Sequence, residues 1–232
     1  MKTYSDDQKE LEEQTVRVTE RYVSEIVVAF DLCPWAAPAL HHGRVQISVI
    51  TEFFDADAID QAARICDERL RTTPSEIELV LLAMPRLVVG RLDMDRLLAS
   101  LRAEMSKREG VASFALAAFH PLAGPDTETA ERFIPYLRRS PDPLVQAVRF
   151  SALQGLDGKH SGGTTFLDSS ALEPGALDPK DWSGGKQESL RARIAKRNLD
   201  RVLERGIHDL AARLDDICED RNRTHRLLGL ID

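Results

Sequence analysis

The chain has 232 residues, of which 38 are acidic and 31 are basic, and its formal net charge at pH 7 is -7. This charge excludes a sequence-wide attraction to nucleic acids and anionic membranes, so we expect no nucleic-acid or membrane partner. Because domains usually span about 100–200 residues, we predict one domain over residues 1–232.

The sequence lacks the features of a targeting or membrane-spanning segment. The first residues, 1–7, have no apolar stretch of the kind a secretory signal requires. The longest apolar run, residues 79–84, is far shorter than a bilayer span. The three cysteines are spaced too widely for a disulfide framework or a paired zinc motif; they are Cys33, Cys66 and Cys218. We therefore predict a cytoplasmic protein.

The first part of the chain predicts a helix and then a strand. Residues 7–32 have apolar side chains at helical spacing and acids in the first turns, which predicts a helix that Pro34 ends. Residues 35–44 are expected to form a loop. Residues 45–51 alternate between apolar and polar side chains, which is typical of a half-exposed strand at a sheet edge.

The next elements alternate between helix and strand. A helix is predicted to begin at Asp55 and to end before Pro74. Residues 77–84 are almost uniformly apolar, as in a strand covered on both faces. A further helix has its apolar stripe over residues 94–105, and residues 113–119 are another apolar strand. This β-α-β-α-β order predicts an α/β fold with a short, parallel three-stranded sheet.

The second half of the chain is predicted to be mainly helical. Residues 140–142 combine a capping serine, a proline and an acid, which predicts a helix over about residues 140–153. The rest of the predicted layout is a long loop or insertion at 155–185, helices at about 187–205 and 207–227, a core at about 22–206 and a C-terminal helical extension at 207–232.

His120 is the first candidate for catalysis. It directly follows a predicted strand, and ligands of open α/β sheets bind outside the carboxyl ends of the strands. Histidine is also well suited to acid–base chemistry near neutral pH. The alternative is a histidine that only holds the backbone at the end of the sheet.

Cys33 is the second candidate, as a nucleophile or a redox thiol. Cys66 and Cys218 each lie on the apolar stripe of a predicted helix and are interpreted as core residues, whereas Cys33 lies at a helix end. Because the carboxyl end of a helix dipole raises the pKa of a thiol, a reactive Cys33 requires a cationic neighbour, such as an arginine or His120.

Several polar residues of the second half are candidates for binding an anion. Arg138 and Arg139 precede the predicted helix at Ser140, where free N–H groups and guanidinium groups suit a phosphate or carboxylate. Solvated arginines beside a capped helix are the alternative. Asn198 lies on the apolar stripe of its helix beside Arg197, and we interpret it first as a structural bracket and second as a ligand contact.

The sequence predicts no metal site and does not identify a cofactor. His41 and His42 have no carboxylate or cysteine at a recognised ligand spacing. Residues 155–161 superficially suggest a phosphate-binding loop, but a histidine replaces its Ser or Thr and no apolar strand precedes it, so we reject that motif.

Four short motifs occur in one order along the chain. They are residues 32–36 (LCPWA), 119–121 (FHP), 139–144 (RSPDPL) with Arg149, and 196–199 (KRNL). Together they resemble the bacterial family called domain of unknown function 1415, over about residues 22–206. The resemblance implies no known reaction. Its motifs contain the polar residues Cys33, His120, Arg139, Ser140, Arg149, Arg197 and Asn198.

Polar residues from four separate segments are an unusual choice for core packing, so we hypothesise that they share a pocket. The preferred hypothesis is an enzyme that acts on a small anionic molecule. Its catalytic residues would be Cys33 and His120, and its ligand-binding residues Arg139, Ser140, Arg149, Arg197 and Asn198. The alternatives are a non-catalytic module that binds an anionic ligand or a partner, and a structural or regulatory protein that associates through residues 207–227. A homo-oligomer is left open.

Overall fold

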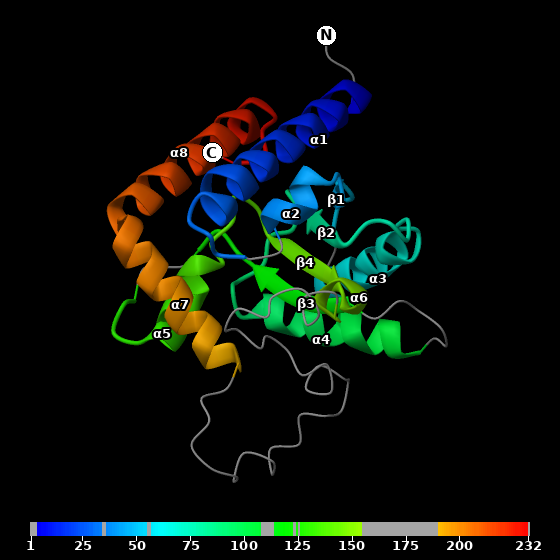
Figure 1. The fold of residues 1–232 in the computed structure, drawn as a ribbon. Coiled ribbons are helices and arrows are strands. Elements are labelled where there is room, and N and C mark those ends of the chain that lie inside the picture. The colour runs from blue at the N-terminus through cyan, green and yellow to red at the C-terminus, as the bar shows by residue number, and fades with distance from the viewer. Residues whose placement is uncertain are drawn as a thin grey trace.

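Figure 1 shows the fold of the chain in the computed structural model, drawn as a ribbon. The described residues are 4–33, 36–54, 57–107, 114–122, 124, 126–154 and 190–231. The long loop predicted at 155–185 lies outside these residues.

Four strands form one mixed sheet, which confirms the α/β class. The strands are β1 (Val45–Val49), β2 (Leu79–Ala83), β3 (Phe114–Phe119) and β4 (Leu144–Arg149). Their order across the sheet is β1-β2-β4-β3. Strands β1 and β2 are parallel, whereas β4 is antiparallel to both of its neighbours, β2 and β3.

The predicted parallel three-stranded sheet is therefore wrong in its pairing. The three predicted strands exist, and β1 is an edge strand as expected, but β4 separates β2 from β3. The helix predicted over residues 140–153 is instead strand β4 followed by the short helix α6 (Phe150–Gln154). The Ser140 hydroxyl donates a hydrogen bond to the Asp142 carbonyl oxygen (2.6 Å) and closes a turn before the strand.

Strand β4 forms because both of its faces are covered. Leu144 and Val148 pack in one core cluster, and Val145 and Ala147 pack in the other. A helix would bury only one stripe of such a segment, whereas a central strand buries alternate residues on opposite sides. Tertiary packing therefore overrides the local helix-start signal.

Helices in the first part of the chain largely match the prediction. The helix expected at residues 7–32 is α1 (Tyr4–Arg21), which continues as the π-helix η1 (Tyr22–Val28). Helices α3 (Ala58–Arg71) and α4 (Asp93–Ser106) are the two predicted crossover helices. The short helix α2 (Ala36–His41) lies where a loop was expected.

Helix α5 (Ala130–Leu137) was not predicted from the sequence. Thr129 caps it, because the Thr129 hydroxyl accepts a hydrogen bond from the Arg132 N–H (3.2 Å). Phe133 and Tyr136 form its buried face, and Pro135 lies within it. The helix carries the chain from the end of β3 back toward the start of β4.

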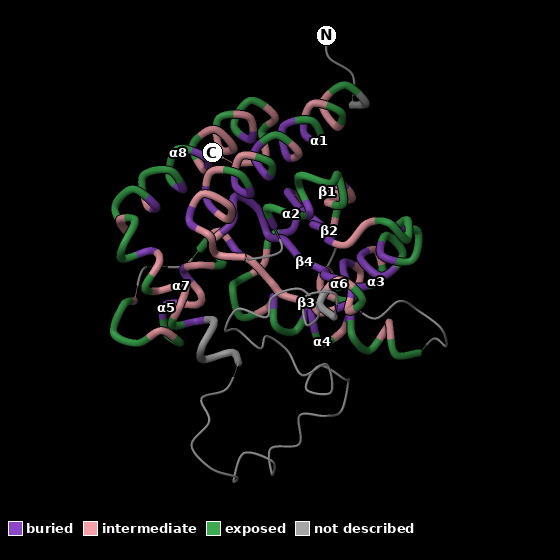
Figure 2. The backbone as a smooth tube through the Cα atoms, in the orientation of Figure 1, coloured by how far each residue is buried: buried purple, intermediate pink, exposed green. Residues whose placement is uncertain are grey.

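Helices cover both faces of the sheet, and each face has its own core (Figure 2). Helices α1, η1 and α8 contribute to the first core, which includes Ile26, Leu81 and Leu214. Helices α3 and α4 contribute to the second, which includes Cys66 and Leu82. The adjacent residues Leu81 and Leu82 of β2 thus point to opposite faces, as in any strand.

The last two helices are α7 (Leu190–Arg205) and α8 (Ile207–Leu227), which confirms both helices predicted there. Gly206 joins them with a φ of 103°, a backbone conformation that other residues rarely adopt. Helix α8 runs beside α1 (Figure 1), where the Arg21 guanidinium forms ion pairs with Asp216 and Asp220. The predicted extension is thus an integral part of the first core.

Within the described part of the chain, every helix is too short or too polar to cross a lipid bilayer.

Candidate functional site

His120 lies at the carboxyl end of β3, as predicted, and is only 6% exposed. Its Nδ1 atom accepts a hydrogen bond from the Leu122 N–H (3.1 Å), and its Nε2 atom lies 2.9 Å from the Val89 carbonyl oxygen. An amide N–H can only donate, so Nδ1 carries the lone pair and Nε2 carries the proton. His120 is thus a neutral imidazole that joins two loops. Proton transfer by this ring would require one of the two hydrogen bonds to open.

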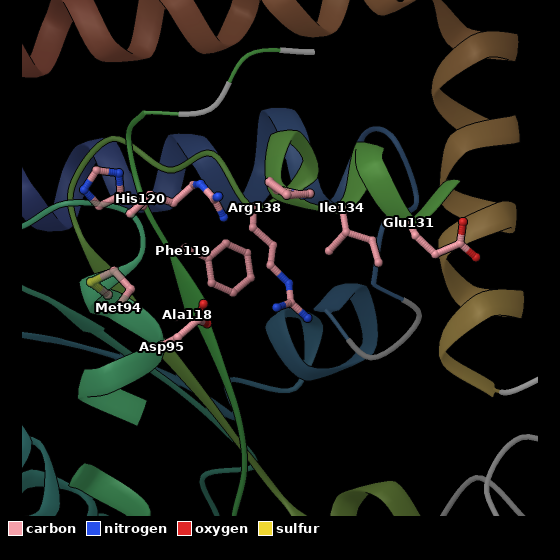
Figure 3. Close-up of a pocket in the computed structure, with 10 residues that line it drawn as sticks. Met94, Asp95, Ala118, Phe119, His120, Glu131, Ile134 and Arg138 are labelled. Atoms are coloured by element: carbon pink, nitrogen blue, oxygen red, sulfur yellow. The ribbon is translucent and has the colours of Figure 1, made fainter. Parts of the chain in front are cut away.

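A pocket of about 160 Å³ lies beside His120, between α4, the end of β3 and α5 (Figure 3). Its walls combine apolar side chains with charged ones. The lining residues are Arg91, Met94, Asp95, Ala118, Phe119, His120, Glu131, Ile134, Pro135 and Arg138. The pocket thus opens at the carboxyl end of the sheet, where ligands of α/β folds usually bind.

Two cations and two anions border this pocket. Arg91 and Asp95 belong to the start of α4 and the residues before it, and Glu131 and Arg138 belong to α5 and its end. Among the described residues, no side-chain hydrogen bond or ion pair engages Arg91, Asp95 or Glu131. All three side chains are thus available to a bound molecule.

Cys33 follows η1, in a segment that α7 holds in place. The Arg197 guanidinium forms an ion pair with Asp31 (2.6 Å), and the Asn198 amide donates a hydrogen bond to the Leu32 carbonyl oxygen (3.1 Å). Asp31 adopts a positive φ of 52°, which is uncommon for a residue other than glycine. In this structure Arg197 and Asn198 therefore position the segment that leads into Cys33.

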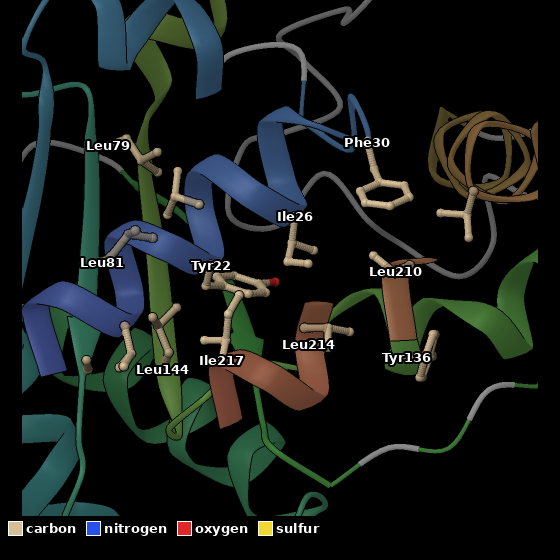
Figure 4. Packing of buried hydrophobic residues seen from close by; sticks show 14 of the residues in the cluster. Tyr22, Ile26, Phe30, Leu79, Leu81, Tyr136, Leu144, Leu210, Leu214 and Ile217 are labelled. Carbon is tan, nitrogen blue, oxygen red and sulfur yellow. The ribbon is translucent and has the colours of Figure 1, made fainter. Parts of the chain in front are cut away.

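Tyr22 is a buried tyrosine that packs against the end of β3. Its hydroxyl is buried, and no described residue forms a hydrogen bond with it. Burial raises the pKa of Tyr22 above its usual range; the Arg138 guanidinium opposes this shift, and the thiols of Cys33 and Cys218 add to it. The ring of Tyr22 also packs edge-on against Phe119, with the ring centroids 6.4 Å apart (Figure 4 shows Tyr22 in the core).

Sequence reasoning missed Tyr22 as a polar residue of interest. It shares the helix stripe of Ile26 and Phe30, where a tyrosine ring is typical of core packing, and its hydroxyl gives no separate signal in the sequence. Tyr22 is the first residue of a π-helix, and this position indicates a functional role because π-helical segments often occur at functional sites.

The segments that carry Cys33 and His120 both contact the core on the α1 and α8 face. Leu32, next to Cys33, and Phe119, next to His120, pack with that core, whereas Val89, bonded to His120, packs with the core on the α3 and α4 face. His120 lines the pocket and Cys33 does not. A pocket shared by the two residues, and a catalytic role for either, stays a prediction.

Arg139 and Ser140 form contacts within the protein. The Arg139 guanidinium donates to the Pro121 carbonyl oxygen (3.1 Å) and to the Asp215 carboxylate (2.8 Å). Ser140 is fully buried and bonds the Asp142 backbone. These contacts join the motif at 139–144 to the loop after β3 and to α8. The predicted ligand-binding role of both residues stays a prediction.

Arg149 is a buried bracket in this structure. Its guanidinium donates to the carbonyl oxygens of Ile77 (2.6 Å), Thr73 (3.0 Å) and Pro74 (2.9 Å). It also lies over the Phe114 ring, 4.8 Å from the centroid. These contacts anchor the turn before β2 to the end of β4, far along the strands from His120. Its predicted ligand-binding role is likewise untested.

A second polar cluster lies under α8 and was not predicted. Asp142 is buried and accepts a hydrogen bond from the Arg221 guanidinium (2.8 Å). His225 is 1% exposed, and burial followed by the charges of Arg221 and Arg86 lowers its pKa to about 3. Within the described residues, Asp142 Oδ2, His225 Nδ1 and Arg86 Nε have no hydrogen-bond partner. Burial also raises the pKa of the Asp142 carboxyl, although Arg221 opposes that shift.

The described residues contain no group of three or more His, Cys, Asp or Glu side chains that could hold a metal ion. The rings of His41 and His42 contact each other, with centroids 5.1 Å apart, on the exposed end of α2.

Comparison with known proteins identifies a family but no activity. No curated protein and no solved structure matches the chain. One family model, described as "Protein of unknown function (DUF1415)", matches residues 14–157, which is more than half of the sequence. The match includes η1, all four strands and the motifs around Cys33, His120 and Arg139. The chain therefore belongs to the DUF1415 family.

Proposed function

We propose that this protein binds a small molecule with a negatively charged group, in the pocket between α4, the end of β3 and α5. The supporting observation is the pair of guanidinium groups, Arg91 and Arg138, on a pocket of about 160 Å³. Guanidinium groups bind carboxylates and phosphates through two parallel hydrogen bonds. Arg91 has no competing side-chain partner among the described residues.

The apolar part of the pocket would hold the rest of the ligand. Met94, Phe119 and Ile134 line it and provide surface for a hydrocarbon group. A protein cavity of roughly 150 Å³ accommodates benzene, so a ligand of similar size fits a pocket of about 160 Å³. A small carboxylate would match the two guanidinium groups and the volume.

The family motifs would support this pocket from behind. His120 joins the Val89 segment to the segment after β3, and Arg139 holds Pro121. These hydrogen bonds fix the two loops that carry Arg91 and the end of β3. Such support reduces the ordering cost of ligand binding, because the pocket is formed before the ligand arrives.

Calorimetric titration with benzoate, isovalerate and inorganic phosphate tests the proposal. At least one of them should bind, and Arg91→Ala and Arg138→Ala should each weaken its affinity by about tenfold or more, because each removes a charge-assisted contact. Arg102→Ala, on the exposed side of α4, is the matched control. Absence of binding at millimolar concentration, or equal affinity in all variants, would refute the proposal.

Thiol chemistry at Cys33 on an anionic substrate is the second candidate function. The observation that favours it is the shared influence of Cys33 and Arg138 on the buried Tyr22 hydroxyl. A nearby guanidinium would stabilise the thiolate that a nucleophile needs.

The pH dependence of Cys33 alkylation by iodoacetamide tests this candidate, in a chain with Cys66→Ala and Cys218→Ala. An activated thiol should react at pH values well below the ordinary thiol pKa of about 8.5, and Arg138→Ala should remove that advantage. Arg132→Ala, on the exposed face of α5, is the control. A thiol that alkylates like free cysteine would exclude the nucleophile.

A further inference from the structure

We infer that the ligand of this pocket is a zwitterion, a small apolar α-amino acid that presents both an ammonium and a carboxylate group. This inference rests on the proposed function, because it assumes that the pocket between α4 and α5 is the binding site. It adds a specific role for two side chains that an anion alone would not use, Asp95 and Glu131.

The charges of the four charged side chains that line the pocket sum to zero. Arg91 and Arg138 supply two positive charges, and Asp95 and Glu131 supply two negative ones. A site that binds only an anion gains nothing from the two carboxylates, because like charges repel the ligand. A molecule with one charge of each sign is attracted by both pairs.

The charges are also arranged in pairs along the two walls. Arg91 and Asp95 are four residues apart on the α4 side, and Glu131 and Arg138 are seven residues apart on the α5 side. Figure 3 shows the labelled Asp95 and Arg138 side chains near Phe119 of β3, whereas the Glu131 side chain lies at the far end of α5 with its carboxylate directed away from Phe119. Each wall therefore carries one acid and one base among the residues that line the pocket.

The two carboxylates are not used within the protein. Neither Asp95 nor Glu131 forms an ion pair or a side-chain hydrogen bond with a described residue, although each shares its wall with an arginine. Two other acids on α4, the helix of Asp95, are paired: Asp93 with Arg96, and Glu104 with Lys107. An ammonium group of a ligand would provide the missing cationic partner, with charge-assisted hydrogen bonds.

The apolar wall sets the side-chain class. Met94, Phe119 and Ile134 face the same pocket as the four charges. An α-amino acid has its two charges on adjacent atoms and its side chain on one side, so the charged end can lie between the helices while the side chain packs on this wall. The volume of about 160 Å³ limits that side chain to a small hydrocarbon group.

Calorimetric titration of the full chain compares amino acids with analogues that lack one charge. The probes are valine and leucine, with isovalerate as the deaminated analogue of valine and isobutylamine as its decarboxylated analogue. At least one of the two amino acids should bind about tenfold or more tightly than both single-charge analogues. Equal affinity for isovalerate and valine would overturn the zwitterion while leaving the anion-binding proposal intact.

Two variants separate the roles of the charges. Asp95→Asn should reduce amino-acid affinity by about tenfold and leave isovalerate affinity equal or higher, because only the ammonium group loses a partner. Glu131→Gln should act in the same direction, and Glu68→Gln, exposed on α3, is the control. An unchanged preference in both Asp95→Asn and Glu131→Gln would refute the inference. If neither amino acids nor carboxylates bind, both the inference and the proposed function fail.

Discussion

The Nε2 atom of His225 lies 3.8 Å from the Oδ1 atom of Asp142, inside the protein beneath α8. Both side chains are almost fully buried, at 1% and 2% exposure. Burial, followed by the charges of Arg221 and Arg86, lowers the pKa of the imidazole, so His225 is neutral in the folded protein near pH 7. This arrangement links the packing of α8 to pH.

His225 predicts a loss of stability on acidification. Its pKa falls from 6.5 to about 3 in the folded state, so below pH 6.5 the unfolded chain takes up a proton that the folded chain does not. The folded state should therefore lose up to about 1.4 kcal/mol per pH unit from this group as the pH falls. The raised pKa of Asp142 acts in the opposite direction, since the folded state binds that proton more tightly.

Comparison of His225→Asn with the wild type isolates this contribution. Between pH 6.5 and about pH 5, the free energy of unfolding measured in urea should fall by about 2 kcal/mol less in the variant than in the wild type. In the control variant His208→Asn, which is exposed on the same helix, the free energy of unfolding should depend on pH with the same slope as in the wild type. Equal slopes in His225→Asn and wild type would contradict the prediction.

Removal of one partner of the ion pair between Asp142 and Arg221 should lower the free energy of unfolding more than removal of both partners. Arg221→Met leaves the Asp142 carboxylate, 2% exposed, without its guanidinium partner. Loss of one partner of a buried pair destabilises by about 3–5 kcal/mol. The double variant Asp142→Asn with Arg221→Met should lose less, because no uncompensated charge remains. Chemical denaturation of both variants measures the difference, with Arg226→Met as an exposed control.

Arg149 should contribute to stability. Arg149→Met removes three hydrogen bonds to backbone carbonyls and a contact with Phe114, so we expect a loss of about 3 kcal/mol in unfolding free energy. Lysine should restore little, because it lacks the planar fork. Arg44→Met, at an exposed ion pair, should cost far less. A variant with wild-type stability but weakened ligand binding would instead favour the ligand-binding role predicted from the sequence.

His120 provides a further test of structural against catalytic function. His120→Phe removes the hydrogen bonds to Val89 and Leu122, so it should lower the unfolding free energy by about 2 kcal/mol. It should also weaken binding in the adjacent pocket, because the loop carrying Arg91 loses its anchor. His42→Phe on the surface should be neutral. An His120→Phe variant that unfolds like the wild type would favour the predicted acid–base role.

Most elements could be predicted because their burial patterns are local. The uniform run at residues 77–84 identified β2, and the alternation at 45–51 identified an edge strand. Strand β4 was missed because the sequence Ser140-Pro141 is compatible both with the start of a helix and with a turn before a strand. Only the neighbouring strands, β2 and β3, decide between the two.

The candidate site was predictable only in part. His120 was located correctly at a strand end, because strand and histidine are adjacent in the sequence. Asp95 and Glu131 carried no signal, since isolated acids on helices are usually solvated. They line one pocket because α4 and α5, far apart in the sequence, both contribute to it beside the end of β3. Such long-range placement has no counterpart in local sequence patterns.

The position of β4 in the sheet also determines when the sheet can form during synthesis of the chain. Strand β2 acquires its second neighbour only when Leu144 to Arg149 have left the ribosome, some sixty residues after β2 itself. Until then, one backbone edge of β2 and both backbone edges of β3 are unpaired, and such edges are templates for aggregation. A chain that ends before Leu144 lacks β4 and therefore cannot complete its sheet, so truncation there should yield insoluble protein.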